Sequence, residues 1–338
     1  MQLIEHLDQQ TRTIVETGYR EALERPVTLR ANTLKATVDD VCRDLDARGI
    51  AYERVPWYGD ALVVRDARER DLWELDIYRK GHIYLQSLSS MLPPLLLTTR
   101  AGADILDMCA APGGKTAQIA ALTGNAAHLT ACEMSAPRAE KLAYNLDKLG
   151  AVNVNVMRTD ARRLDEFFSF DQILLDAPCT GTGTYRAGDE RAEKRMTPQL
   201  LAKVTKSQRA LLDRALTVLK PSGTLVYSTC SVLAEENDDQ VRAALKRHRA
   251  ARSRRFSSMR PPRWRPTTRP NAPARPRMRF APRSSRTPRA ARSVAPRSSA
   301  NARLRARSPS RPHACLRASM LPLSGKRLVH RQRCARTL

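Results

Sequence analysis

Two cysteines stand directly after hydrophobic, strand-like runs, where a thiol could act as a nucleophile. Cys179 ends the run Ile-Leu-Leu-Asp-Ala-Pro-Cys, and Cys230 ends the run Leu-Val-Tyr-Ser-Thr-Cys. A third apolar run starts at Ile105 and leads into the small-residue segment Met-Cys-Ala-Ala-Pro-Gly-Gly-Lys-Thr. In open α/β proteins such runs end at the carboxyl edge of a parallel sheet, where ligands bind. Two thiols and a ligand loop at one edge predict covalent chemistry rather than simple binding.

The small-residue segment from Asp107 to Thr116 does not match the common phosphate-binding loops. A Walker A loop requires glycine five residues before its Gly-Lys-Thr, and Cys109 stands at that position. The GxGxxG fingerprint of dinucleotide sites is absent as well. What remains is an acidic strand end, a loop of small residues and a helix start, in which Gly113 and Gly114 let the backbone approach a ligand closely. We interpret this segment as a cofactor loop without a polyphosphate cradle.

Acidic residues end the two strands that follow this loop. Glu133 closes the run His-Leu-Thr-Ala-Cys-Glu and suits the two ribose hydroxyls of a nucleoside, and Asp160 follows the next strand, where it could meet an adenine amino group. Each acid by itself is equally well explained as a turn residue or a solvated charge. The loop and the two acids follow successive strands, which favours a nucleoside site, and S-adenosylmethionine is its natural occupant.

The pattern of apolar residues predicts the elements that position these groups. Residues 81–246 alternate strands with amphipathic helices, which indicates a doubly wound parallel sheet. The predicted strands are 104–107, 128–133, 152–157, 172–176 and 224–228, and the predicted helices are 115–122, 137–149 and 199–219. Residues 1–80 are predicted to form a small α+β subdomain, with strands at 28–33 and 61–64 and a helix at 38–48.

Three motifs follow one another along the chain. They are the segment 107–116, the run Asp-Ala-Pro-Cys-Thr-Gly-Thr-Gly at 176–183, and Ser-Thr-Cys-Ser at 228–231 followed by Glu-Glu-Asn at 235–237. Together they closely resemble the Nop/Sun family of RNA cytosine-C5 methyltransferases, over about residues 28–246, and the N-terminal part looks most like bacterial ribosomal RNA methylases. The resemblance implies a class I methyltransferase domain preceded by an RNA-binding α+β subdomain. It also implies S-adenosylmethionine as the cofactor and RNA, ribosomal or transfer, as the substrate.

The resemblance further implies a role for each site residue. Cytosine C5 attacks a methyl sulfonium only after a thiolate has added to C6, and the resemblance assigns that thiolate to Cys230. It gives Asp176 the N3 edge of the flipped base and Cys179 a part in product release. Lys115 adds positive charge, which would lower a thiol pKa or meet a phosphate. The cofactor-binding residues expected are Cys109, Ala110, Ala111, Pro112, Gly113, Gly114, Lys115, Glu133, Asp160 and Asp176.

The assignment of the nucleophile has two alternatives. DNA cytosine methylases, which this region resembles more distantly, use a Pro-Cys pair after the fourth strand, so Cys179 could be the nucleophile. Cys230 could also be a buried, inert thiol. The Thr-Cys-Ser element favours Cys230, because a sufficient Cys179 would leave the second thiol unexplained. The remaining cysteines are expected in packed positions or in the C-terminal tail: Cys42, Cys109, Cys132, Cys315 and Cys334.

The positive charge of the chain lies at one end. Residues 247–338 hold 27 Lys and Arg and no acid. The net charge of the whole chain is +25, so residues 1–246 have a net charge of only −2. Seven cysteines without a CxxC pair argue against a disulfide framework or a zinc site and favour reduced thiols. The N-terminus lacks a signal-peptide pattern, and no apolar run approaches the roughly 20 residues that span a bilayer. These features predict a soluble cytoplasmic protein.

The tail, residues 247–338, is rich in Arg, Pro and Ser without sustained periodicity, which predicts disorder. It can be interpreted as an RNA-binding arm or as the product of out-of-frame translation of GC-rich DNA. In the family a β-hairpin follows residues equivalent to 235–246, and the tail shows no such pattern. The strand before Cys230 would then be an exposed edge, and we expect a poorly soluble or inactive chain.

Two other functions remain open at this stage. A decayed methylase fold with a basic arm would bind RNA without catalysis. A small-molecule methyltransferase would explain the cofactor loop but neither thiol.

Overall fold

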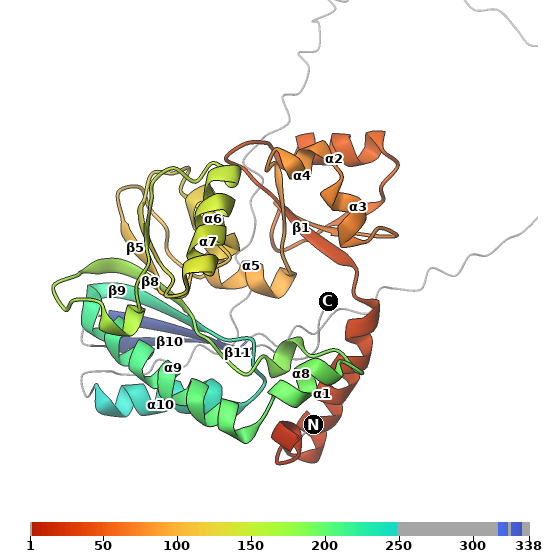
Figure 1. Cartoon of the computed structure of the whole chain (residues 1–338). Helices are drawn as coiled ribbons and strands as arrows, with labels where there is room; N and C mark the ends of the chain where they lie inside the picture. The colour runs from red at the N-terminus through yellow and green to blue at the C-terminus, as the bar shows by residue number, and fades with distance from the viewer. Residues whose placement is uncertain (1, 249–316, 324–325, 333–338) are drawn as a thin grey trace, which may run out of the picture. The chain divides into compact units, whose positions relative to one another are not determined.

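The computed structural model of the chain describes residues 2–248, 317–323 and 326–332. These residues form one four-stranded and one seven-stranded sheet, with helices around them (Figure 1). No helix in the described ranges is both long enough and apolar enough to cross a membrane.

The N-terminal sheet is antiparallel, with the strand order β2-β3-β1-β4. Its strands are β1 (Val27–Ala31), β2 (Tyr52–Arg54), β3 (Ala61–Val64) and β4 (Ile83–Leu85). Helix α2 (Val38–Ala47) begins at a capping box between Thr37 and Asp40. One apolar face of α2, including Val41 and Leu45, packs against Leu29 of β1. The predicted α+β subdomain, with its strand–helix–strand start, is confirmed.

One strand beyond residue 80, the predicted end of this subdomain, pairs with the N-terminal sheet. Ile83 of β4 lies opposite Ala31 of β1, so β4 belongs to the N-terminal sheet. A strand of three residues is too short to show the alternation by which strands are recognised. The other elements of residues 2–95 are η1 (Gln2–Ile4), α1 (Gln9–Glu21), η2 (Ala22–Glu24), α3 (Glu69–Trp73), α4 (Asp76–Arg79) and α5 (Leu88–Leu95).

The second sheet has the order β10-β11-β9-β8-β5-β6-β7 among the described strands. Its first five strands along the chain are mutually parallel: β5 (Asp104–Asp107), β6 (His128–Cys132), β7 (Val154–Met157), β8 (Phe170–Asp176) and β9 (Leu219–Ser228). The helices beside them are α6 (Gly114–Leu122), α7 (Ala136–Leu149), α8 (Glu190–Arg195), α9 (Pro198–Val218) and α10 (Asp238–Arg247). Each strand and helix predicted for this domain is confirmed, with ends shifted by five residues at most.

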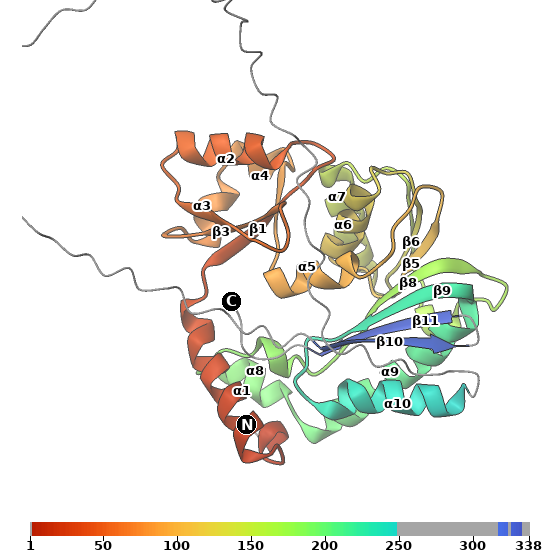
Figure 2. The same ribbon diagram turned by 180° about the vertical axis from the view of Figure 1, so that it is seen from behind.

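Side chains of this sheet alternate between two buried layers. Leu106 and Leu175 point to the layer that contains α9 and α10, whereas Ile105, Leu174 and Val226 point to the layer that contains α6 and α7. Figures 1 and 2 show these helix pairs on opposite sides of the strands. The sheet is therefore doubly wound, as predicted, with one helical layer on each of its faces.

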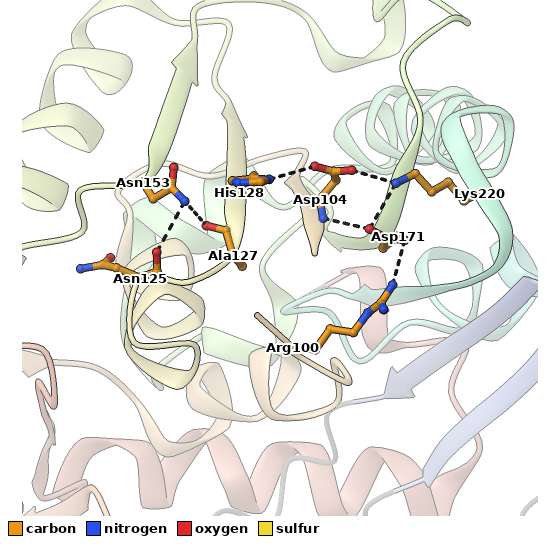
Figure 3. A network of polar contacts seen from close by, with 8 residues as sticks. All are labelled: Arg100, Asp104, Asn125, Ala127, His128, Asn153, Asp171 and Lys220. Carbon is orange, nitrogen blue, oxygen red and sulfur yellow. Dashed lines mark hydrogen bonds and ion pairs between the residues drawn. The ribbon is translucent and has the colours of Figure 1, made fainter. Parts of the chain in front are cut away.

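A polar network joins the amino ends of the strands, at the edge opposite to the predicted site (Figure 3). Lys220 Nζ lies 2.7 Å from Asp104 Oδ2 and 3.2 Å from Asp171 Oδ2. Arg100 reaches Asp171, and His128 reaches Asp104. The network links β5, β6, β8 and β9 and so fixes the ends of the strands whose other ends carry the site.

The sheet continues past β9, which corrects the expectation of an exposed edge. Strands β10 (Arg317–Leu323) and β11 (Lys326–Gln332) form an antiparallel hairpin, and β11 pairs with β9 in parallel (Figure 2). An edge strand offers its backbone hydrogen bonds to an extended segment, and β11 takes up those of β9. A Ser-Gly pair between two short apolar runs was the available signal, hidden by the Arg- and Pro-rich composition around it. The rest of the tail prediction, including Cys315 and Cys334, lies outside the described residues.

Candidate active site

Asp107, the last residue of β5, holds the start of the cofactor loop from inside. The residue is 3% exposed. Its Oδ2 accepts a hydrogen bond from Thr116 Oγ1 at 2.7 Å, and its Oδ1 accepts one from the Cys109 N–H at 3.4 Å. Burial raises the pKa of Asp107 to about 6, against the lowering effect of the Thr116 hydrogen bond. The two bonds tie strand, loop and helix start together.

The two glycines of the loop are required by packing inside the chain. Gly113 has a φ of +105°, and a Cβ there would lie 3.0 Å from Leu142 Cδ1 on α7. A Cβ on Gly114 would lie 2.5 Å from Tyr84 Cε1 on β4, so α6 begins in contact with the N-terminal sheet. The peptide bond before Pro112 is cis. Close packing against α7 and β4 is therefore a second reason for the two glycines, beside the approach of a ligand expected from the sequence.

Helix α7 supports both the loop and the acid after β6. Arg138 Nη2 donates to the Ala111 carbonyl at 3.1 Å, and its Nη1 lies 3.2 Å from Glu133 Oε2. The Glu133 side chain is only 3% exposed. Asn145 Nδ2 donates to the Pro112 carbonyl at 2.6 Å. Sequence reasoning missed Arg138 and Asn145, which lie two turns apart on one face of the helix.

Asp160, after β7, is held by a neighbouring arginine that sequence reasoning also missed. Arg162 Nε lies 2.9 Å from Oδ1, and Nη2 lies 2.7 Å from Oδ2. These hydrogen bonds lower the pKa of Asp160, so the group is a carboxylate at neutral pH. Oδ1 also accepts a hydrogen bond from the Arg162 N–H at 3.0 Å, and Oδ2 also lies 3.0 Å from Arg162 Nε, so Arg162 contacts both oxygens twice.

Asp176 ends β8 and forms an ion pair at the carboxyl edge. Lys115 Nζ lies 2.8 Å from its Oδ2, and Ser228 Oγ, at the end of β9, donates to its Oδ1 at 2.6 Å. The parallel register places Asp176 directly opposite Ser228. The ion pair is partly exposed, with 17% of the Lys115 side chain and 26% of the Asp176 side chain accessible. A base entering the edge could therefore reach both groups.

Two thiols from neighbouring strands meet next to this ion pair. Cys179 follows β8 and Cys230 follows β9, and their Sγ atoms lie 2.9 Å apart. The Cys230 N–H also donates to Cys179 Sγ at 3.2 Å. The hydrogen bond to Cys230, followed by burial, raises the pKa of Cys179. Either thiol can be the donor in this contact, so the two sulfur atoms are placed to share a proton.

A family model described as 16S rRNA methyltransferase RsmB/F matches residues 94–285, which is more than half of the chain. The chain belongs to this family. A second model, described as the RsmF/B-like ferredoxin-like domain, matches residues 1–69. The small subunit ribosomal RNA methyltransferase F of Shewanella sp. (strain ANA-3) is 39% identical over 223 residues, covering 64% of this chain and 46% of the relative. That of Shewanella loihica is 39% identical over 218 residues, covering 62% and 45%. The chain spans about half the length of the curated relatives it matches.

Solved structures share the fold. A methyltransferase homolog protein from Pyrococcus horikoshii has a TM-score of 0.61 at 32% identity, covering 75% of this chain and 83% of that one. NSun6 from the same organism, solved with SFG, has a TM-score of 0.64 at 23% identity, covering 76% and 88%. The predicted class I methyltransferase fold is confirmed, and membership of the RsmB/F family agrees with the predicted cofactor, S-adenosylmethionine.

In this RsmB/F chain the predicted site residues follow one another along a single edge. The strand order places the Cys230 turn on β9, Asp176 and the Cys179 turn on β8, the cofactor loop on β5, and the two further acids on β6 and β7. The other described cysteines are packed as predicted: Cys42 and Cys132 are buried, and Cys109 packs against the α9 layer. Within the described ranges no cluster of His, Cys, Asp or Glu is suited to a metal.

Asn237 fixes the turn that carries Cys230. It is fully buried, and its Nδ2 donates to the carbonyls of Ser231 at 3.1 Å and Leu233 at 2.8 Å. Its Oδ1 accepts a hydrogen bond from Thr229 Oγ1 at 2.7 Å. The Glu-Glu-Asn run was recognised from the sequence only as a motif element, without this role.

Helix α1 supports the same turns from the other side. Tyr19 of α1 packs edge-on against Tyr185, with ring centroids 4.8 Å apart, and its carbonyl accepts a hydrogen bond from the Ala187 N–H. Val232 and Leu233 share this apolar cluster. The segments that follow Cys179 and Cys230 are therefore packed against an N-terminal helix outside the β1–β4 sheet.

Proposed function

We propose that the chain transfers a methyl group from S-adenosylmethionine to C5 of a cytosine in RNA, through a covalent bond between Cys230 and C6. Ribosomal RNA is the favoured substrate, because the relatives of the family carry that activity in their names. The observation that carries the proposal is the pair of thiols 2.9 Å apart beside the Asp176–Lys115 ion pair. A binding module has no need of two sulfurs in contact at a ligand edge.

The residues of the edge fit S-adenosylmethionine, which supplies an electrophilic methyl group when bound. Glu133 offers a carboxylate to ribose hydroxyls, and Asp160 offers one to an adenine amino group. The cofactor loop, residues 109–115, follows β5. In the sheet β5 lies between β8, which precedes Cys179, and β6, which precedes Glu133. The cofactor would therefore lie along the β5–β7 side and the base along the β8–β9 side.

The chain's own groups then perform the steps on the base. The Cys230 thiolate forms a bond to C6, and the electron pair of the C5–C6 double bond moves to C5. C5 can then form a bond to the methyl carbon, and the electron pair of the broken sulfur–methyl bond would stay on the sulfur of the cofactor. Asp176, paired with Lys115, holds the N3 edge of the flipped base, which favours addition at C6. The Lys115 ammonium offsets the negative charge that builds up on the N3 edge of the ring.

Release of the methylated base requires the bond between Cys230 and C6 to break. The proton on C5 passes to water, its electron pair restores the double bond, and the bond between C6 and the Cys230 sulfur breaks. The Cys179 thiol, already a hydrogen-bond partner of that sulfur, stabilises the departing thiolate. The raised pKa of Cys179 supports this division of roles over the alternative in which Cys179 attacks.

The test is methyl transfer to unmodified small-subunit ribosomal RNA, free and in assembled subunits, with detection of 5-methylcytosine in the digested nucleosides. Cys230→Ala is expected to abolish transfer, and Cys179→Ala to block turnover after the first methylation. Cys42→Ala, which removes a buried thiol of α2 outside the site, serves as the control and should retain activity. Cofactor binding without 5-methylcytosine in any RNA fraction would contradict the proposal.

A further inference from the structure

Glu236, at the end of η5 (Ala234–Glu236), is a fully buried carboxylate without a cation in ion-pair distance among the described residues. Its charge is balanced by hydrogen bonds instead. Oε1 accepts from the Thr180 N–H at 2.8 Å and from Gln208 Nε2 at 3.0 Å, and Oε2 accepts from Thr180 Oγ1. A buried acid that relies on neutral donors is costly to keep, so its position calls for a reason.

These bonds enclose Cys179 on both sides. Glu236 holds Thr180, the residue after the cysteine, directly. Gln208 of α9 holds the residue before it, because its Nε2 also donates to the Pro178 carbonyl at 2.9 Å. The Pro-Cys-Thr turn is therefore fixed between η5 and α9, with its sulfur directed at Cys230.

The negative charge of Glu236 acts on the same thiol. The pKa of Cys179 is raised first by its hydrogen bond to Cys230, then by burial, and further by the charges of Cys230 and Glu236. A like charge in a buried setting disfavours a second anion close to it. Glu235, the preceding residue, differs on every point, because it is 41% exposed and pairs with His6.

We propose that Glu236 is a positioning residue that holds Cys179 against Cys230 as the hydrogen-bond donor and so reserves the nucleophile's role for Cys230. The catalytic part of this inference rests on the proposed function. The arrangement itself is a property of the chain without cofactor or RNA. It can therefore be tested even if methyl transfer is never found.

The experiment measures the alkylation rates of Cys179 and Cys230 by iodoacetamide across pH, with each cysteine quantified by peptide mass spectrometry in the full chain. In Glu236→Gln the amide can still accept from the Thr180 N–H, but the charge is gone. The pH midpoint for Cys179 is expected to fall by about one unit. Glu235→Gln is the matched control and should leave both profiles unchanged. An unmoved Cys179 midpoint in folded Glu236→Gln would overturn the proposal.

Gln208→Met separates position from charge and carries the test if Glu236→Gln does not fold. It removes the bonds to Pro178 and to Glu236 but leaves the carboxylate in place. We expect Cys179 to be alkylated severalfold faster than in the parent, at pH values above the midpoint, without a fall in the midpoint itself. An alkylation rate equal to that of the parent would show that the turn is held without this network, which would refute the positioning role.

Discussion

Replacement of Asn237 by alanine should destabilise the chain and loosen the turn that carries Cys230. The side chain makes three buried hydrogen bonds, two to carbonyls and one to a hydroxyl. Each neutral hydrogen bond contributes about 1 kcal/mol net to stability. The partners of Asn237 are buried, so they cannot bond to water instead when the side chain is removed. Asn237→Ala should therefore lower the free energy of unfolding by about 3 kcal/mol.

The assay is urea unfolding followed by far-ultraviolet circular dichroism, with the slope on denaturant compared between variants. Asn155→Ala is the control, because Asn155 is an exposed residue of β7 and its replacement should change the stability by no more than about 0.5 kcal/mol. Methyl transfer should fall in Asn237→Ala under conditions in which the variant is still folded. A loss of stability below about 1 kcal/mol, with an unchanged slope, would refute the reasoning that this side chain holds the turn.

Three further predictions follow from the fold and the cofactor loop. The pKa of Asp107 is raised from 3.8 to about 6, so this carboxyl favours folding below pH 4 and its contribution is lost as the pH rises through 6. In the parent chain this effect should lower the free energy of unfolding by about 3 kcal/mol between pH 4 and pH 7, as measured by urea unfolding at each pH. The decline should be absent in Asp107→Asn. Gly113→Ala should weaken S-adenosylmethionine binding about tenfold in calorimetry, because the left-handed φ and the contact with α7 oppose a Cβ, whereas Gly124→Ala, with open space around it, should not. Hydrogen bonding to Lys220 lowers the pKa of Asp104. The stabilisation from this pair is therefore present above pH 4 and is lost as the pH falls. Lys220→Met should be less stable than the parent at pH 7, and the difference in the free energy of unfolding should shrink toward pH 2.

The sequence predicts most of the second domain because its strands are buried on both faces. Runs such as Ile173 to Leu175 have no polar interruption, and they end in residues that a core would not tolerate. The elements missed are short or atypical. β4 has three residues, and the β10–β11 hairpin stands in a segment dominated by Arg and Pro. In both cases pairing with a partner strand, rather than local pattern, decides the structure.

Some residues of the candidate site could be predicted from the sequence, and others could not. Cys179, Cys230 and Asp176 could be predicted because strand ends place them, and their motifs are local. The supporting groups could not, because their partners are far away in the sequence. Glu236 bonds to Thr180 across 56 residues, and Arg138 reaches Ala111 across 27. Such contacts arise from the order of strands in the sheet, which spacing along the chain does not reveal.

The most direct test of the account is to trap the covalent complex on RNA that contains 5-fluorocytosine, in the presence of S-adenosylmethionine. Fluorine at C5 prevents the elimination step, so the sulfur–C6 bond should persist through denaturing electrophoresis and peptide mapping. We expect an adduct on Cys230 that is lost in Cys230→Ala and retained in Cys179→Ala. An adduct mapped to Cys179, or a folded, cofactor-binding chain that forms none, would contradict it.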